Sequence, residues 1–385
     1  MPKEIHIHNK SEKPDNIVRK EVLIEEECSG IESELPSFLR GFFIYLKGNV
    51  LPMSRLAYLR DIKFFFMFLI NETDLTRAET PREVKLDDVR DVKAVDVNIF
   101  LDYCRKYRVE KEDSTYIYQN GNKSLARKRS SVSVMFKQLY RDELVPVNIT
   151  DGFDPIRLPK AGDKEIKALR DDEVMIMLDA VKSGSRLTKK EKQFWEKTRL
   201  RDHAMLLIFV TYGLRLSELQ QLNLSSFNFG RGEFKVYRKR GKEAMMPLNQ
   251  SVTAALRAYI ESERAPSDSL SEDQKDALFL SLRGTRLTDR QIRQIVKKYT
   301  SVALGTGRDD GYSPHKLRAT TATSLIERGN SIFDVQELLN HDNVTTTQLY
   351  AAHRSNAKRE LIKDIEWETE EEMVGIHGPE IDGGE

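Results

Sequence analysis

Apolar residues at helical spacing dominate the first third of the chain. Between Leu35 and Glu72 they recur at steps of three and four residues, as in Leu39, Phe42, Phe43 and Leu46. Ser54 is the expected N-cap of a helix that runs from Arg55 to Asn71. This pattern predicts two helices in the first half of an all-α domain.

Two further helices are predicted, at residues 95–107 and 124–144, which makes a four-helix domain over residues 34–146. Residues 1–33 mix charges without a sustained period, so we expect an extended or loosely attached arm there. Residues 147–167 are rich in turn formers and lack periodicity, which predicts an interdomain linker. The spacer segments 108–122 and 182–199 are long, so the sequence does not define the exact boundaries of the first domain.

A second, mostly helical domain is predicted from residue 168 to residue 363. Asp171 and Asp172 lie where its first helix would start, and helix capping is their expected role. Two β-rich runs, 234–238 and 244–248, flank a turn at Gly241 and predict a hairpin. The fold class expected from these patterns is mainly α with a small β-sheet.

The charge of the chain is unevenly distributed. The 385 residues carry a net charge of +1, but residues 364–385 hold nine acidic residues and no Lys or Arg, so residues 1–363 carry +10. A moderately basic body with an acidic tail fits a partner that is a polyanion, although many solvated surfaces have the same balance. The acidic tail either regulates the preceding segment or only increases solubility, and we favour the second.

Several classes of protein are disfavoured by composition. The two cysteines, Cys28 and Cys104, lie far apart and predict neither a disulfide framework nor a zinc site. The longest apolar run, at residues 64–70, is too short to span a bilayer, and the start of the chain has no apolar signal core. We therefore expect a cytoplasmic protein. No Gly-x4-Gly-Lys-[Ser/Thr] loop, the pattern of a nucleotide-binding P-loop, is present in the sequence.

The predicted helix at 124–144 has a cationic face beside an apolar stripe. Its candidate DNA-binding residues are Lys123, Arg127, Lys128, Arg129, Lys137 and Arg141. Taken alone, such a face is more often solvated than bound to DNA.

Candidate chemistry begins in the segment from Ser313 to Arg318. Ser313 at the N-cap and Pro314 at the first helical position predict a helix start. His315 and Arg318 then share one face at the end of the helix that favours anions, which would suit a phosphodiester. The alternative is a basic helix end at the surface.

Two other segments add candidates. A predicted helix over residues 204–210 breaks at Gly213, and Arg215 follows the break, where it could offer a bidentate fork to a phosphate or form a structural ion pair. Asn340 lies at a helix end, in a position that tolerates a left-handed turn, and His341 follows it directly. Tyr350 stands nine residues beyond His341, and nearby arginines would stabilise its phenolate.

Taken together and in this order, Arg215, His315, Arg318, His341 and Tyr350 resemble the active-site residues of the tyrosine recombinase, or phage integrase, family. The resemblance covers about residues 170–363. It implies an N-terminal core-binding domain of the SAM-like type, made of four helices, and an α+β catalytic domain. The one departure within these motifs is Asn340, which stands where the family has Gly. Asn can replace Gly at this position because it also adopts positive φ.

The resemblance also implies roles for individual residues. Tyr350 would be the nucleophile, Glu218 would support Arg215, and a lysine on the hairpin would protonate the leaving oxygen. Lys239 aligns best with that lysine, and Lys242 is its competitor. No metal or other cofactor is implied.

The implied partner is a double-stranded DNA recombination site, bound by a homotetramer on two such sites, in a protein of bacterial or mobile-element origin. One rival is a topoisomerase that cuts one strand with the same chemistry, and another is a DNA-binding regulator without turnover. A two-metal nuclease is disfavoured, because the acidic pairs at 171–172 and 309–310 have no third partner. The sequence does not distinguish integration, excision, inversion and resolution.

Overall fold

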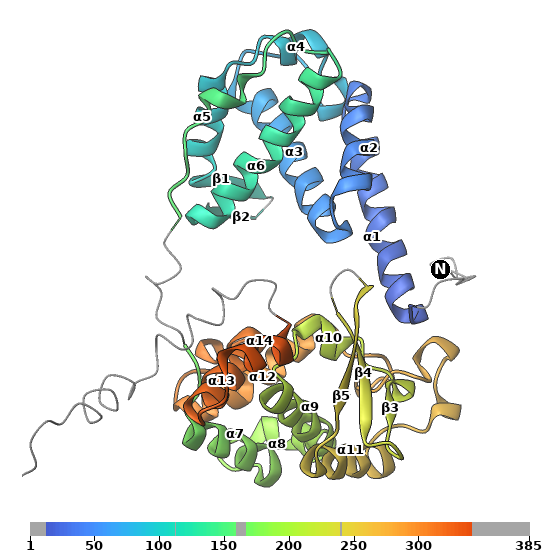
Figure 1. Cartoon of the computed structure of the whole chain (residues 1–385). Helices are drawn as coiled ribbons and strands as arrows, with labels where there is room; N and C mark the ends of the chain where they lie inside the picture. Colours follow the sequence, from blue (N-terminus) through green and yellow to red (C-terminus); the bar gives the residue numbers. More distant parts are fainter. Residues whose placement is uncertain (1–12, 112, 159–166, 239–240, 341–385) are drawn as a thin grey trace, which may run out of the picture. The chain divides into compact units, whose positions relative to one another are not determined.

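The computed structural model describes residues 13–111, 113–158, 167–238 and 241–340, in two compact units that divide between residues 160 and 161 (Figure 1). The first unit contains the helices α1 Asp15–Ser33, α2 Arg40–Asn49, α3 Pro52–Glu72, α4 Leu86–Arg90, α5 Ala94–Tyr103 and α6 Asn122–Arg141, with the hairpin β1 Lys106–Lys111 and β2 Ser114–Gln119. The second contains α7 Asp171–Ser183, α8 Lys189–Trp195, α9 Arg199–Tyr212, α10 Leu216–Gln220, α11 Gln250–Ser262, α12 Asp289–Leu304, α13 Pro314–Glu327 and α14 Ile332–Leu339, with the strands β3 Phe227–Asn228, β4 Glu233–Tyr237 and β5 Glu243–Pro247. The predicted class, mainly α with a small sheet, is confirmed.

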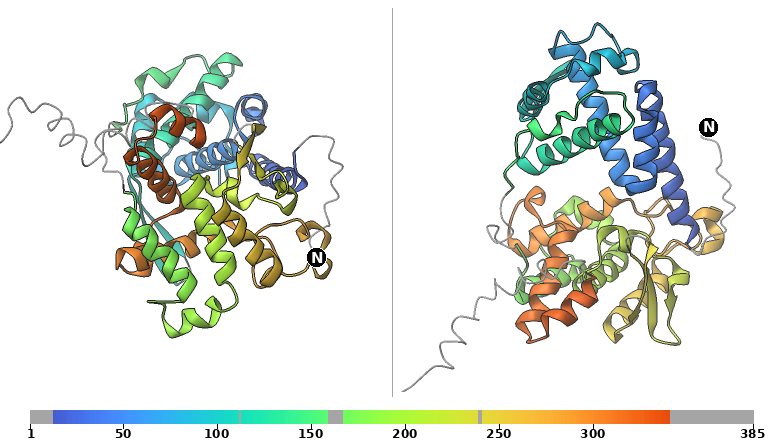
Figure 2. Two further views of the ribbon diagram at one scale, coloured as in Figure 1. Left: turned by 60° about the horizontal axis from the view of Figure 1, so that its bottom comes forward. Right: turned by 45° about the horizontal axis from the view of Figure 1, so that its top comes forward.

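The first unit is built around α3, which lies against α1 and α6 (Figure 2). Its core is aromatic, with the side chains of Phe65, Phe66, Phe100 and Phe136 at most 1% exposed. The predicted N-cap Ser54 is wrong. The helix begins at Pro52, three residues before the predicted start, and Leu51 is its N-cap, because the fixed φ of proline suits the first helical position.

The expectation of a loosely attached arm is wrong from Asp15 onward, where α1 begins. Arg55 of α3 is 4% exposed, and its guanidinium bonds Glu25 at 2.5 Å and Glu32 at 2.6 Å on α1. Cys28 of α1 is fully buried in the same core. Burial and these two ion pairs therefore hold α1 on the first unit, so that the unit has more than the four helices predicted.

The long spacer at 108–122 is accounted for by the antiparallel hairpin of β1 and β2. Tyr107 pairs with Tyr118 across the two strands, and their rings stack at 5.2 Å. Tyr107 in turn stacks on Tyr103 of α5 at 5.7 Å between ring centroids. Aromatic packing therefore joins an otherwise exposed hairpin to the helical core.

The second unit packs its helices around α9, which contacts α7, α11 and α13. The strands form a sheet in the order β3-β4-β5, all antiparallel, with Phe234 opposite Met246. Alternate residues of β4, Phe234 and Val236, are fully buried, so one face of the sheet closes the core. The predicted hairpin is confirmed, with Gly241 at φ +72° in its turn.

A buried network of charges fixes α9 to α12. Asp202 is fully buried, and its carboxylate accepts hydrogen bonds from Arg201 at 2.7 Å and from the Tyr299 hydroxyl at 3.3 Å. The Lys298 ammonium lies 3.5 Å from the same carboxylate. Burial lowers the pKa of Lys298, and the charge of Asp202 opposes that shift.

We expect Asp202→Ala to destabilise the second unit by about 3–5 kcal/mol, because it leaves the buried Arg201 and the partly buried Lys298 without their counter-charge. Asp172→Ala is the matched control, since this carboxylate is 65% exposed and pairs with Arg170 at the surface. Urea unfolding of the full chain measures both variants. Equal losses of stability in the two would show that the buried network contributes nothing.

Candidate active site

Arg215 sits at a sharp junction between α9 and α10, as the sequence predicts. Gly213 ends α9 in the left-handed conformation, at φ +58° and ψ +33°, and Arg215 is the N-cap of α10. The Glu218 carboxylate accepts one hydrogen bond from the Arg215 backbone N–H and another from its guanidinium, both at 2.8 Å. Glu218 is 4% exposed, so a buried carboxylate fixes the orientation of the arginine.

Arg318 reaches the same junction from α13. This helix has Ser313 at its N-cap and Pro314 at its first position, which confirms the predicted helix start. The Arg318 guanidinium is buried and donates to the Gly213 carbonyl at 2.7 Å. His315 lies one turn earlier on α13 and is exposed.

The C-terminal end of α14 lies on these arginines. Asn340 adopts the left-handed conformation, at φ +47° and ψ +59°, as predicted. Its carbonyl accepts from the Arg215 guanidinium at 2.9 Å, and the Leu339 carbonyl accepts from Arg318. The two arginines, far apart in the sequence, therefore meet at the last turn of α14.

A third arginine, Arg238, joins this cluster and was not among the predicted site residues. It follows β4 directly and donates to the Leu338 carbonyl at 2.9 Å. Burial lowers the pKa of Arg238; the charge of Glu218 opposes this, and the charge of Arg215 adds to it. The only hint in the sequence was its position beside Lys239 in the predicted hairpin.

Three of the predicted catalytic residues, Lys239, His341 and Tyr350, lie outside the residues that the structure describes. The competing Lys242 is exposed, and its carbonyl accepts from the Arg238 backbone N–H at 2.7 Å. The choice between Lys239 and Lys242 therefore stays as the sequence left it.

The cationic residues of α6 divide into two groups. Lys123, Lys137 and Arg141 are exposed, and their assignment to DNA stays a prediction. Arg129 donates to the carbonyls of Phe153 and Asp154, and so ties the chain after α6 to this helix.

The structure contradicts the predicted DNA contact of Lys128, because this side chain is buried. Lys128 is 7% exposed, and its ammonium lies 3.1 Å from the buried carboxylate of Asp61 on α3. Arg127 pairs with the same carboxylate from the surface. Lys128 therefore stabilises the packing of α3 on α6.

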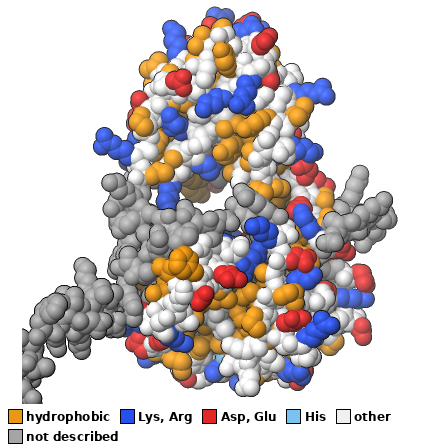
Figure 3. Space-filling view, viewed as in Figure 1, with side chains coloured by type: hydrophobic (Ala, Val, Ile, Leu, Met, Phe, Trp, Pro, Cys, Tyr) orange, Lys and Arg blue, Asp and Glu red, His pale blue; other side chains and the backbone are white. Residues whose placement is uncertain are grey.

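On the face drawn in Figure 3, basic and acidic side chains are interspersed over both units.

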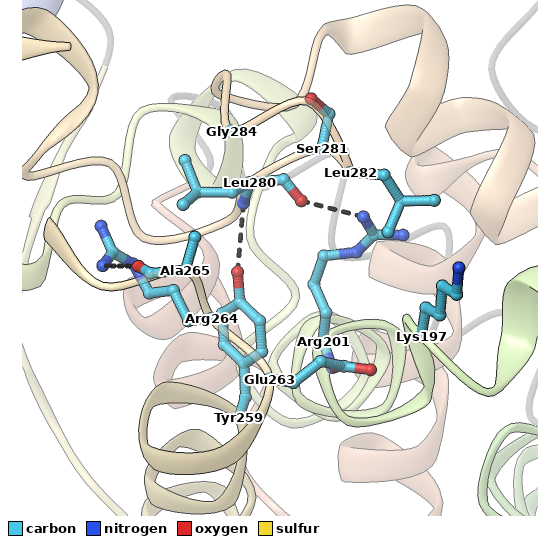
Figure 4. Close-up of a pocket in the computed structure, with 10 residues that line it drawn as sticks. All are labelled: Lys197, Arg201, Tyr259, Glu263, Arg264, Ala265, Leu280, Ser281, Leu282 and Gly284. Carbon is cyan, nitrogen blue, oxygen red and sulfur yellow. Dashed lines mark hydrogen bonds between the residues drawn. The ribbon is translucent and has the colours of Figure 1, made fainter. Parts of the chain in front are cut away.

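A pocket elsewhere on the second unit is structural (Figure 4). Arg264 donates to the carbonyls of Lys275 and Ala277, both at 2.8 Å, and Arg201 donates to the Leu280 carbonyl at 2.8 Å. The Tyr259 hydroxyl bonds the backbone of the same loop. Because its polar groups serve to fix the chain from residue 275 to residue 284, we assign this pocket no chemistry.

Neither a metal site nor a membrane-spanning helix is found among the residues that the structure describes. No group of three His, Cys, Asp or Glu side chains there is arranged to hold a metal ion. No helix in that part of the chain has the length and apolar character needed to cross a bilayer.

Comparison with known proteins places the second unit in a family. The model of the phage integrase family matches residues 167–357. The tyrosine recombinase XerC of Natranaerobius thermophilus is 33% identical over 281 residues, which cover 72% of this chain and 84% of that protein. XerC of Alcanivorax borkumensis is 36% identical over 228 residues, 59% of this chain and 68% of that protein.

Solved structures of recombinases have the same fold. The XerH site-specific recombinase, in a post-cleavage complex with a palindromic difH substrate, aligns with a TM-score of 0.58 at 18% identity, over 93% of this chain and 91% of that one. A lambda integrase tetramer bound to a Holliday junction aligns with a TM-score of 0.51 at 17% identity, over 82% and 76% of the two chains. At such identities the likeness concerns the fold alone. Together, the family model and the XerC relatives show that this chain belongs to the tyrosine recombinase family.

Proposed function

We propose that this protein recombines DNA at specific sites by cutting and rejoining strands through a covalent bond to Tyr350. The observation that carries the proposal is the meeting of Arg215 and Arg318 at the end of α14. Asn340 ends that helix, and the chain leads on directly to His341 and, nine residues later, to Tyr350. Two arginines at the end of the helix that precedes His341 and Tyr350 in the sequence suit a phosphoryl transfer.

In the proposed reaction, Tyr350 reacts as its phenolate, whose oxygen attacks the scissile phosphorus and forms a 3′-phosphotyrosyl bond. The bond from phosphorus to the 5′ oxygen breaks, and Lys239 gives a proton to that oxygen. Arg215, Arg318 and His315 stabilise the negative charge of the transition state, and His341 donates a hydrogen bond to the phosphate. Attack of a 5′-hydroxyl on the phosphotyrosine reverses these steps and rejoins the strand.

Glu218 has a supporting role in this scheme. Its buried carboxylate holds both the backbone and the guanidinium of Arg215, so the arginine is oriented before DNA arrives. A guanidinium carries five N–H donors, so Arg215 can bond Glu218 and Asn340 and still donate to a phosphate oxygen.

The proposed chemistry needs neither a metal ion nor ATP, because the phosphotyrosyl bond conserves the energy of the broken phosphodiester. The active assembly is a homotetramer on two double-stranded sites, with phosphate contacts supplying most of the affinity. The exposed cations of α6, Lys123, Lys137 and Arg141, belong to the DNA-contacting surface of the first unit.

A plasmid with two copies of the candidate site tests the proposal, with the site taken from repeats that flank the gene. We expect deletion or inversion of the intervening segment in the presence of EDTA, and only when both sites are present. Relaxation of plasmids without any site would favour the topoisomerase. Binding to the site without rearranged products or cleaved strands would favour the regulator.

A further inference from the structure

Three consecutive carbonyls at the end of α14 are each bonded by a different arginine. The Leu338 carbonyl accepts from Arg238, the Leu339 carbonyl from Arg318 and the Asn340 carbonyl from Arg215. The last carbonyls of a helix have no partner within it and carry the negative end of its dipole. Cations from three separate elements thus cap one helix end.

Arg238 differs from the other two arginines in origin. Arg215 and Arg318 belong to the proposed phosphate site, whereas Arg238 comes from the end of β4, next to the hairpin turn. Its backbone N–H donates to the Lys242 carbonyl at 2.7 Å, so the residue is fixed at the base of that turn. Its side chain therefore links the hairpin to α14.

The surroundings of Arg238 indicate why an arginine stands there. Its side chain approaches the Met246 sulfur at 3.4 Å, and its Nε is buried without a hydrogen-bond partner among the residues described. The nearby charge of Glu218 favours the cation, while burial and Arg215 disfavour it. Holding a cation in this place is costly, and its hydrogen bond to the Leu338 carbonyl of α14 helps to offset that cost.

Resting on the proposed function, we infer that Arg238 is a positioning residue for strand cleavage. It fixes the last turn of α14 relative to the hairpin that carries Lys239, and thereby the point from which the chain leads to His341 and Tyr350. The residue acts through the Leu338 carbonyl and does not itself neutralise the phosphate. It thereby connects the segment of the general acid with the segment of the nucleophile.

Arg238→Met keeps most of the apolar stem and removes the hydrogen bond, so it tests this inference. We expect the first-order rate of covalent complex formation on a nicked DNA site to fall by about 10- to 100-fold, as for the loss of one hydrogen bond from a charged donor. DNA affinity at fixed salt should be unchanged. Arg238→Lys, which keeps a charged donor, should recover part of the rate. Lys235→Met is the control: Lys235 lies on β4, three residues before Arg238, but pairs with the exposed Glu243, and the variant should cleave as the wild type does.

Two further readouts separate positioning from other roles. A scissile methylphosphonate lacks one phosphate charge, and we expect the same fold-loss on it as on normal DNA. Hydrogen exchange without DNA should be faster in the last turn of α14 in Arg238→Met, at an unchanged melting temperature.

Recovery of the variant on methylphosphonate, a loss confined to DNA affinity, or unchanged cleavage and exchange would each overturn the inference. If the wild type forms no adduct, the proposed function fails. The exchange measurement then still decides whether Arg238 orders α14.

Discussion

Arg318→Met should lower the rate of strand cleavage by about 10²- to 10³-fold, the usual effect of removing one preorganised donor from a transition state. The arginine is 3% exposed, and it joins the Gly213 carbonyl of one helix junction to the Leu339 carbonyl of α14. Its charge is thus held in place before the substrate binds. The measurement is the single-turnover rate of covalent complex formation on a nicked site.

Because Arg318 is buried, its loss also affects folding, and a matched control is needed. Arg264 is 8% exposed and likewise donates to backbone carbonyls, but it lies in the structural pocket of Figure 4. We expect Arg264→Met to lower the melting temperature without slowing cleavage by the folded protein. If both variants lose rate in proportion to stability, Arg318 is a structural residue and its assignment to catalysis is wrong.

Gly213→Ala should both destabilise the second unit and slow cleavage. An alanine at φ +58° is strained, and its Cβ would lie 2.5 Å from a methyl carbon of Leu339 and 3.3 Å from the Thr321 Cβ. Relief of that clash moves α14 away from the junction and disturbs the acceptors of Arg215 and Arg318. We expect a loss of about 2–5 kcal/mol in unfolding free energy, the sum of left-handed strain and overpacking.

Gly305→Ala isolates the cost of the backbone conformation. This glycine has φ +65°, and a Cβ there would meet nothing within 4 Å. We expect this control to lose about 1–2 kcal/mol, the cost of the left-handed conformation alone, and to cleave normally. Equal losses in the two alanine variants would mean that the close approach of Leu339 to Gly213 has no energetic consequence.

The parts of the site that the sequence predicted well are marked by local chemistry. Gly213 and Asn340 end helices in left-handed conformations, and Ser313 with Pro314 begins one. Each signal acts within a few residues, so it can be identified without knowing the tertiary structure. The fold class followed from similar signals for the starts and ends of helices, combined with hydrophobic periodicity.

The features that the sequence did not predict depend on contacts between distant segments. α1 mixes charged and apolar residues without a sustained period, and it is held in part by ion pairs with Arg55 of α3. The sequence alone predicts that Lys128 contacts DNA, whereas in the structure its partner is Asp61, 67 positions away. Arg238 acquires its role only because α14, 100 positions later, ends beside it. No periodic pattern encodes such pairings.

The central claim, a covalent bond between Tyr350 and DNA, is tested most directly with a suicide substrate. A site with a nick near the scissile phosphate is incubated with the protein in EDTA, and denaturing gels reveal any protein–DNA adduct. We predict an adduct with the wild type, mapped to Tyr350 by peptide mass spectrometry, and none with Tyr350→Phe. An adduct that persists in Tyr350→Phe, or binding to the site without any adduct, would contradict the account.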